Sequence, residues 1–267
     1  NEEIACLTKD AITFFNVDGE PIEKQSKKIE WDINAAEKGG FEHFMLKEIY
    51  EQPKTVRDTL SPRIKGNEVV IEELGMTDEE IASIQKIHIV ACGSAYHTGV
   101  TAKYVIEGLA RIPVEVDVAS EFRYRNPILE EGTMVIVISQ SGETADTLAA
   151  LKLSKEEGAQ TLSITNVLGS SLARLSDYVL YTCAGPEIAV ASTKAYTTQL
   201  VLLACLCLKL ASLFNKDVAC KNHMINQLKQ MPEVVEKMLQ QEDKMAEFAK
   251  LLTNQKDAYF IGRQLDY

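Results

Sequence analysis

The sequence lacks the features that mark several common classes of protein. It has no basic cluster: 28 lysines and arginines stand against 39 aspartates and glutamates, which gives a net charge of −11 at pH 7. An acidic chain of this kind does not attract nucleic acid or an anionic membrane surface through its overall field. We therefore expect neither partner, and any bound anion must be held by local hydrogen-bond donors.

Metal-binding spacing is absent as well. The six cysteines form no C-x-x-C pair and the four histidines are scattered, so we predict no metal site. Cys205 and Cys207 lie in the apolar stretch "VLLACLCLKL" and are expected to be small buried hydrophobes. Reduced thiols are typical of a cytoplasmic protein, which is the location we expect.

Targeting signals are also missing from the sequence. The start, "NEEIACLTKD", has no basic region and no long apolar core, so no signal peptide is expected. The apolar run Leu200–Leu208 is too short to span a bilayer. Because the first residue is not Met, we expect the chain to be an excised piece of a longer protein.

The first 85 residues divide into two kinds of pattern. Residues 1–26 hold two short strand-like runs and the turn signal "DGEP", too little to form a core alone. From residue 40 the pattern is helical until Pro53 interrupts it. Thr77 and Glu80 have the spacing of a capping box, which predicts a short helix over 77–85.

A regular alternation of strands and helices follows. Each strand-like run is rich in Val and Ile, and a helical stretch follows most of them, the longest being the apolar helix over 193–214. This pattern predicts an α/β fold with a parallel sheet covered on both faces. Further helices are expected over 222–253, and "AYFIG" near the end is typical of one more strand. The five predicted strands of the sheet are 86–91, 114–119, 133–139, 161–166 and 177–182.

Small hydroxyl residues follow three of these strands. Because ligands of parallel sheets bind beyond the carboxyl ends of the strands, we expect these residues to meet there. Hydroxyls and free backbone N–H groups at a helix N-terminus make an anion site. Ser141 is placed to be a helix N-cap, and Gly142 to let the backbone approach the ligand. The hydroxyl residues are Ser94, Ser139, Ser141, Thr144, Ser192 and Thr193.

The loop "SQSGET" matches neither the P-loop pattern nor G-x-G-x-x-G. Without a P-loop lysine and a magnesium ligand, a triphosphate does not fit, whereas a monophosphate on a small molecule does. Ordinary helix capping by Ser and Thr is the alternative for each loop taken alone. Three such loops at one sheet edge favour the phosphate site.

Other polar residues near these loops are weaker candidates. We expect His97 to pack or cap a helix and His88 to belong to the core. Glu143 begins a helix, where it favours the dipole and organises hydrogen bonds rather than acting as a base. Glu187 and Lys194 are expected to position the loop between them. We therefore predict no catalytic residue in this chain.

Several motifs resemble a known family. "SQSGET" is similar to the sugar isomerase (SIS) family in general. "KEIYEQP" and "EIAVASTKAYTTQ" resemble more specifically the glutamine–fructose-6-phosphate aminotransferases, or glucosamine-6-phosphate synthases, and the likeness runs along essentially the whole chain. It implies an SIS-type, flavodoxin-like, three-layer fold with a five-stranded parallel sheet and a short N-terminal β remnant.

The resemblance also implies the domain organisation. Residues 1–26 match the tail of a glutaminase domain, and 27–85 a linker with leading helices. Residues 86–253 match the first SIS subdomain, and 254–267 the start of a truncated second one. Such an enzyme joins glutamine-derived ammonia to fructose 6-phosphate and isomerises the product to glucosamine 6-phosphate, without a cofactor.

Sugar-phosphate contacts follow from the same resemblance. Relatives with Thr-Ser after "CG" have a hydroxyl where this chain has Ala95, so we expect altered affinity or ring-form preference. The long apolar helix needs a cover, and the family builds its site across subunits, so we expect a homodimer. The implied contacts are Cys92, Gly93, Ser94, Ser139, Gln140, Ser141, Thr144, Val190 and Ser192.

Catalytic groups of the family fall outside the sequence. Its glutaminase needs an N-terminal Cys, where this chain has Asn1, and its isomerase acid and base residues map beyond Tyr267. Moving a carbonyl along a sugar needs both a base and an acid, so we expect this chain to bind without turnover. The alternatives are a fructosamine-phosphate deglycase, a simple sugar-phosphate isomerase and a non-catalytic sugar-phosphate sensor.

Overall fold

The computed structural model describes residues 3–24, 37–214 and 218–266. It forms two compact units, residues 1–33 and 34–267, and each is described by itself. The first unit is an antiparallel sheet of three strands, one more than the sequence predicted. They are β1 (Glu3–Leu7), β2 (Ile12–Asn16) and β3 (Pro21–Ile22).

Local hydrogen bonds form the turn before β3, which explains why "DGEP" correctly predicted a turn there. The side-chain oxygen of Asn16 accepts hydrogen bonds from the backbone N–H groups of Asp18 (3.0 Å) and Glu20 (2.9 Å). Gly19 supplies the positive φ of 80° that the tight turn requires.

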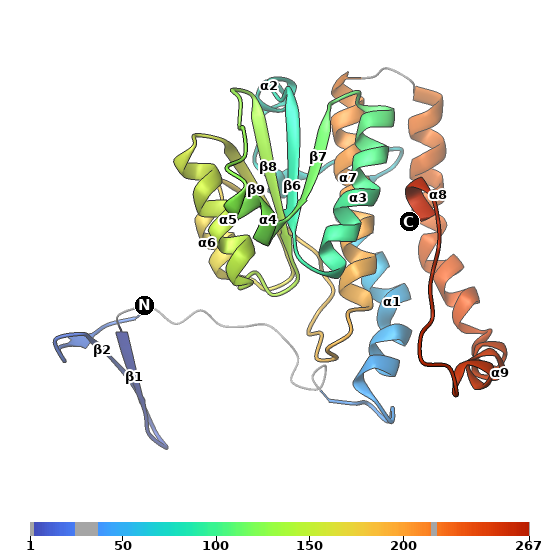
Figure 1. The fold of residues 1–267 in the computed structure, drawn as a ribbon, viewed down its shortest axis with the longest axis horizontal. Helices are drawn as coiled ribbons and strands as arrows, with labels where there is room; N and C mark the ends of the chain where they lie inside the picture. The colour runs from blue at the N-terminus through green and yellow to red at the C-terminus, as the bar shows by residue number, and fades with distance from the viewer. Residues whose placement is uncertain (1–2, 25–36, 215–217, 267) are drawn as a thin grey trace. The chain divides into compact units, whose positions relative to one another are not determined.

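A five-stranded sheet forms the centre of the second unit (Figure 1). The strand order is β10-β9-β8-β6-β7 and every pair is parallel, which is the flavodoxin-like order and confirms the predicted sheet. All five predicted strands are present, with ends that shift by at most a residue. They are β6 (Lys86–Ala91), β7 (Val114–Val118), β8 (Thr133–Ser139), β9 (Gln160–Thr165) and β10 (Tyr178–Tyr181).

Strand β8 shows why the sheet is covered on both faces. Met134, Ile136 and Ile138 belong to one buried cluster, and Val135 and Val137 to a second one. The alternation follows from the two-residue period of a strand.

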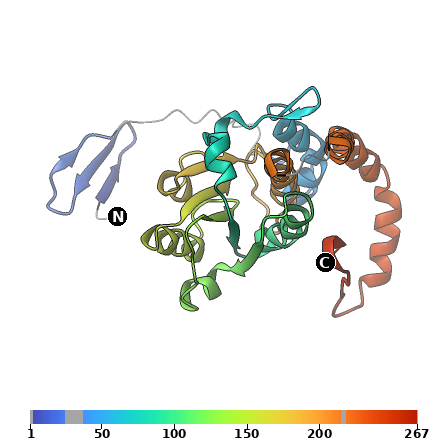
Figure 2. The same cartoon turned by 90° about the horizontal axis from the view of Figure 1, so that it is seen from above.

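Helices pack on both faces of the sheet, so that the sheet is the middle of three layers, seen from above in Figure 2. One face carries α4 (Ala119–Tyr124), α5 (Ala145–Glu156) and α6 (Ser171–Leu175). The other carries α3 (Ser94–Leu109) and α7 (Lys194–Phe214), with α1 (Phe44–Leu60) and α8 (Val218–Leu239) outside them.

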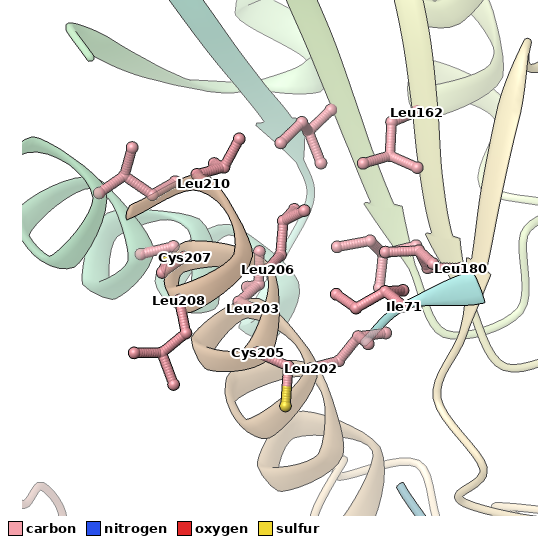
Figure 3. Packing of buried hydrophobic residues seen from close by; sticks show 14 of the residues in the cluster. Ile71, Leu162, Leu180, Leu202, Leu203, Cys205, Leu206, Cys207, Leu208 and Leu210 are labelled. Carbon is pink, nitrogen blue, oxygen red and sulfur yellow. The ribbon is translucent and has the colours of Figure 1, made fainter. Parts of the chain in front are cut away.

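Helix α7 is the centre of the larger core cluster. Figure 3 shows Leu202, Leu203 and Leu206 on the side of the helix that faces the sheet. The helix has 21 residues, well beyond the apolar run Leu200–Leu208, so the length argument made from that run was wrong. By length and composition α7 would suffice to cross a membrane, yet most of it is buried inside this unit, as in the core helix of a folded domain.

Helix α1 runs through Pro53, whereas the sequence predicted an interruption there. Proline has no N–H for the carbonyl four residues earlier, here that of Ile49. The side-chain amide of Gln52 donates to this carbonyl instead, at 3.1 Å. A local side-chain hydrogen bond thus satisfies the group that the proline leaves unpaired.

Short elements complete the second unit. Helix α2 begins after Thr77 with the predicted capping box. The strand predicted in "AYFIG" is not formed, because no strand of the described residues lies beside it to pair with. The remaining elements are β4 (Ile64–Lys65), β5 (Glu68–Val69), the 3-10 turns Glu72–Leu74 and Gln264–Asp266, α2 (Asp78–Ala82) and α9 (Glu242–Leu252).

Candidate functional site

A pocket of about 200 Å³ lies at the carboxyl ends of β6 and β8. The chain leaves β6 toward β7 on one side of the sheet and continues from β8 toward β9 on the other, so the two loops diverge here. This is the switch point at which parallel sheets bind their ligands. The pocket is lined by Cys92, Ser94, Ala95, Ile138, Ser139, Gln140, Ser141, Thr144, Ser192 and Gln199.

Hydrogen bonds among its own residues shape the loop after β8. The hydroxyls of Ser139 and Thr144 are hydrogen-bonded at 2.9 Å, and Ser139 Oγ also accepts from the backbone N–H of Gly142 at 3.1 Å. Ser141 Oγ accepts from the backbone N–H of Glu143 at 3.2 Å. The loop thus turns its hydroxyls toward a common space.

Thr144, not Ser141, is the N-cap residue of α5, so that prediction was wrong. The loop needs two more residues after Gly142 before the backbone turns helical. The side chain of Thr144 makes no capping hydrogen bond within the described part of the chain. The N–H groups of the first turn of α5 are therefore open to an external anion.

Gly142 has a different role from the predicted one. Its φ is +67°, and a Cβ atom built on it would lie 2.1 Å from Ser170 Oγ and 2.7 Å from Thr165 Oγ1. The close approach is therefore to the protein beneath the loop rather than to a ligand. Glycine is needed here both for its backbone conformation and for packing.

The loop after β6 contributes the opposite wall. Gly93 has φ +58° and is the N-cap of α3, which brings Ser94 and Ala95 to the first turn beside the pocket. Cys92 Sγ accepts a long hydrogen bond from Thr147 Oγ1, at 3.8 Å. A left-handed glycine thus turns the chain sharply from the strand into the helix.

The loop between β10 and α7 forms the third wall of the pocket, and Glu187 positions this loop, as the sequence predicted. Its Oε1 accepts from the backbone N–H groups of Thr193 and Ala195, both at 3.0 Å, and so caps α7. Its Oε2 accepts from the hydroxyl of Ser192 at 3.1 Å. The carboxylate therefore fixes the position of Ser192 at the pocket.

Two glutamates of α1 support the same loop, and the sequence analysis missed both. Glu48 is 2% exposed and accepts from the backbone N–H groups of Ile188 (2.6 Å) and Ala189 (3.2 Å). Glu51 pairs with the buried Lys194 at 2.6 Å. The sequence feature that could have identified them is the pair of charged glutamates in "KEIYEQ", on the side of α1 that faces the core.

Seven of the nine predicted binding residues line the pocket. Gly93 and Val190 do not, and the Val190 side chain is fully exposed at the tip of its loop. Sequence reasoning missed Ile138 and Gln199, which line it too. Gln199 gave little signal, because a polar residue within a helix usually faces solvent.

The pocket offers hydrogen bonds rather than proton transfer. Among the described residues that line it, Cys92 is the only titratable one. Glu143 is turned away, because it accepts from the backbone N–H of Ser171 at 2.7 Å, and this hydrogen bond lowers the pKa of its carboxyl group. His97 is exposed and lies outside the lining.

A second cluster of polar residues surrounds His88 of the inner strand β6, beside the edge strand β7. His88 is fully buried, as predicted, with Nε2 2.5 Å from Asp117 Oδ2, and burial lowers the pKa of its imidazole. Arg125 contacts Asp117 (2.6 Å) and Glu115 (3.4 Å). Because the guanidinium already compensates the carboxylates, the cluster is better suited to bracing the sheet edge than to holding a cation.

The fold and this pocket define a class of protein. Residues 80–209 match the SIS domain family, and the chain therefore carries an SIS domain. More particularly, it is similar over its whole length to glutamine–fructose-6-phosphate aminotransferases. That of Clostridium acetobutylicum is 54% identical over 100% of this chain and 44% of its own length, and that of Methanosarcina mazei 43% identical over 99% and 43%.

A solved structure gives the same result. The C-terminal domain of glucosamine–fructose-6-phosphate aminotransferase from Francisella tularensis superposes with a TM-score of 0.83 at 40% identity, over 86% of this chain and 66% of that one. The chain spans less than half the length of the curated relatives it matches.

Proposed function

We propose that the pocket binds fructose 6-phosphate, with the phosphate group at the loop after β8. The observation that carries the proposal is the set of convergent hydroxyls beside the N-terminus of α5, where the N-cap residue Thr144 makes no side-chain capping hydrogen bond within the described part of the chain. Neutral donors and a helix N-terminus hold an anion without a positive field, as this acidic chain requires. The identity of the sugar, fructose 6-phosphate, is inferred from the names of the similar enzymes.

Different loops bind the phosphate and the sugar parts of the ligand. Hydroxyls of the β8 loop and the first turn of α5 hold the phosphate, and the loops after β6 and β10 hold the sugar. The proposed phosphate residues are Ser139, Gln140, Ser141 and Thr144. The proposed sugar residues are Cys92, Ser94 and Ser192, which line the pocket, and Gly93 and Val190, which lie outside the lining on the same loops. Since no acid–base pair lines the described pocket, the chain itself binds and releases the sugar without isomerising it.

In the longer protein that the relatives represent, this site would serve synthesis of glucosamine 6-phosphate with ammonia from glutamine. Residues 1–26 would end a glutaminase domain, 27–85 lead into the first SIS subdomain at 86–253, and 254–267 begin a second. We further propose a cytoplasmic homodimer that needs no cofactor. The exposed apolar residues Met245, Phe248 and Leu251 on α9 supply a surface for such packing.

Calorimetric titration tests the binding proposal. The chain is titrated with fructose 6-phosphate and compared with Ser141→Ala and Thr144→Ala. Each lost hydroxyl removes one hydrogen bond to a charged group, worth about 1.5–3 kcal/mol, and affinity should fall at least tenfold. Ser212→Ala is the matched control, because it deletes an exposed hydroxyl at the other end of α7.

The outcomes separate the site from simple helix capping. Weaker binding in both variants with an unchanged control supports the phosphate site. If the variants bind as tightly as the wild-type chain, or if the wild-type chain does not bind, the hydroxyls only shape the loops and the proposal fails.

A further inference from the structure

Gln199 combines two properties that rarely occur together. It is 2% exposed on α7, and it lines the pocket. Its side-chain oxygen, Oε1, is buried and has no hydrogen-bond partner among the residues that the structure describes. Buried polar side-chain atoms usually have a partner, so an unpaired one in a pocket wall points to a missing ligand group or water.

The neighbouring polar residues of α7 are satisfied by the protein. Thr198 Oγ1 donates to the backbone carbonyl of Lys194 at 2.9 Å, and Thr197 Oγ1 donates to Gln52 Oε1 at 2.5 Å. The helix therefore has the means to pair its polar groups in this turn. Other buried side-chain atoms of the described residues also lack a partner, among them Thr193 Oγ1 just before α7, but Gln199 is the one of these residues that lines the pocket.

The chemistry of an amide oxygen limits what can pair with it. It accepts hydrogen bonds and donates none, while a phosphate group at neutral pH offers mainly acceptors. The complementary donor is a hydroxyl group. Resting on the proposed function, we propose that Gln199 Oε1 accepts a hydrogen bond from a hydroxyl of the sugar, and that this contact selects a hydroxylated phosphate ester over phosphate alone.

The test compares two ligands in one titration series. Gln199→Met keeps the length of the side chain and removes the amide, and Thr144→Ala removes a phosphate contact. Each is titrated with fructose 6-phosphate and, by competition, with inorganic phosphate. Gln199→Met should lower affinity for fructose 6-phosphate about tenfold and leave that for inorganic phosphate unchanged, because only the sugar hydroxyl is lost. Thr144→Ala should weaken both.

Thermal unfolding separates recognition from structure. If Gln199 reads a sugar hydroxyl, the unliganded Gln199→Met variant should melt at the wild-type temperature or above, because it loses an unpaired buried oxygen. In the wild-type chain, the Gln199 side-chain NH2 resonances should shift with fructose 6-phosphate and not with inorganic phosphate. This second measurement needs no variant to fold.

Two results would overturn the inference. Equal losses for both ligands in Gln199→Met, with or without a lower melting temperature, would assign Gln199 a structural role. Undiminished affinity for fructose 6-phosphate would show that its amide makes no contact with the sugar. If instead Thr144→Ala changes neither affinity, the proposed phosphate site itself fails, and this inference fails with it.

Discussion

Replacing Gly142 with alanine should destabilise the sheet unit and distort the loop that forms the proposed phosphate site. The new Cβ would lie 2.1 Å from Ser170 Oγ and 2.5 Å from Ser170 Cβ, so the loop or Ser170 must move. The left-handed φ of +67° costs a non-glycine residue about 1–2 kcal/mol. Overpacking adds about 1–3 kcal/mol. We expect the free energy of unfolding to fall by about 2–5 kcal/mol.

Gly158→Ala is the matched control for backbone strain alone. Gly158 has φ +81° at the opposite end of α5, and a Cβ there would meet nothing within 4 Å. It should cost about 1–2 kcal/mol and leave sugar-phosphate affinity unchanged. Urea unfolding followed by the helical circular dichroism signal measures both variants in the unit that carries the described helices.

A second substitution isolates the clash. Ser170 caps α6 without a side-chain hydrogen bond, so Ser170→Gly alone should cost only a few tenths of a kcal/mol, the order expected for glycine at an N-cap. Combined with Gly142→Ala, it removes the two contacts with Ser170, leaves the 2.7 Å approach to Thr165 Oγ1, and should restore about 1 kcal/mol of the loss, a coupling within reach of a double-mutant cycle. If Gly142→Ala costs no more than Gly158→Ala, or if the double variant restores nothing, the steric reasoning is refuted.

Three further predictions concern buried polar groups. Glu48→Gln replaces the carboxylate that accepts hydrogen bonds from the β10–α7 loop with a neutral amide. We expect the free energy of unfolding, measured in urea, to fall by about 1–2 kcal/mol. Burial lowers the pKa of His88 below its ordinary 6.5, so its share of stability is complete above that pH and is lost as the pH falls through the lower folded-state pKa. His88→Gln should flatten the fall in stability between about pH 7 and pH 5. Burial raises the pKa of Cys205 to about 12, and raises that of Cys207 further, so a thiol reagent should label both only after unfolding.

Each of these has a result that would contradict it. Unchanged stability in Glu48→Gln would mean that the loop needs no charged acceptor. An equally steep pH dependence in His88→Gln would assign the slope to groups other than His88. Labelling of Cys205 as fast as that of the exposed Cys183 would show that the α7 core opens readily.

The pattern of residues was enough to predict the sheet and the edge of it where the pocket lies. Five runs of Val and Ile with helical patterns between them can bury both faces only as a parallel sheet. Small hydroxyl residues at three strand ends then had to meet at one edge. Even strand β8, Thr133–Ser139, was predicted to the residue, because an apolar run ended abruptly in Ser and Gly.

Tertiary structure decided what no local pattern carries. Helix α1 continues past Pro53 because a side-chain amide replaces the missing donor, and Ser141 loses the N-cap to Thr144 because the loop closes on itself first. Glu48 lies far along the chain from the loop it holds, and Gln199 becomes part of the pocket only where α7 passes it. A sequence reports periodicity and local hydrogen-bonding preference, whereas which buried polar group finds a partner depends on contacts between distant segments.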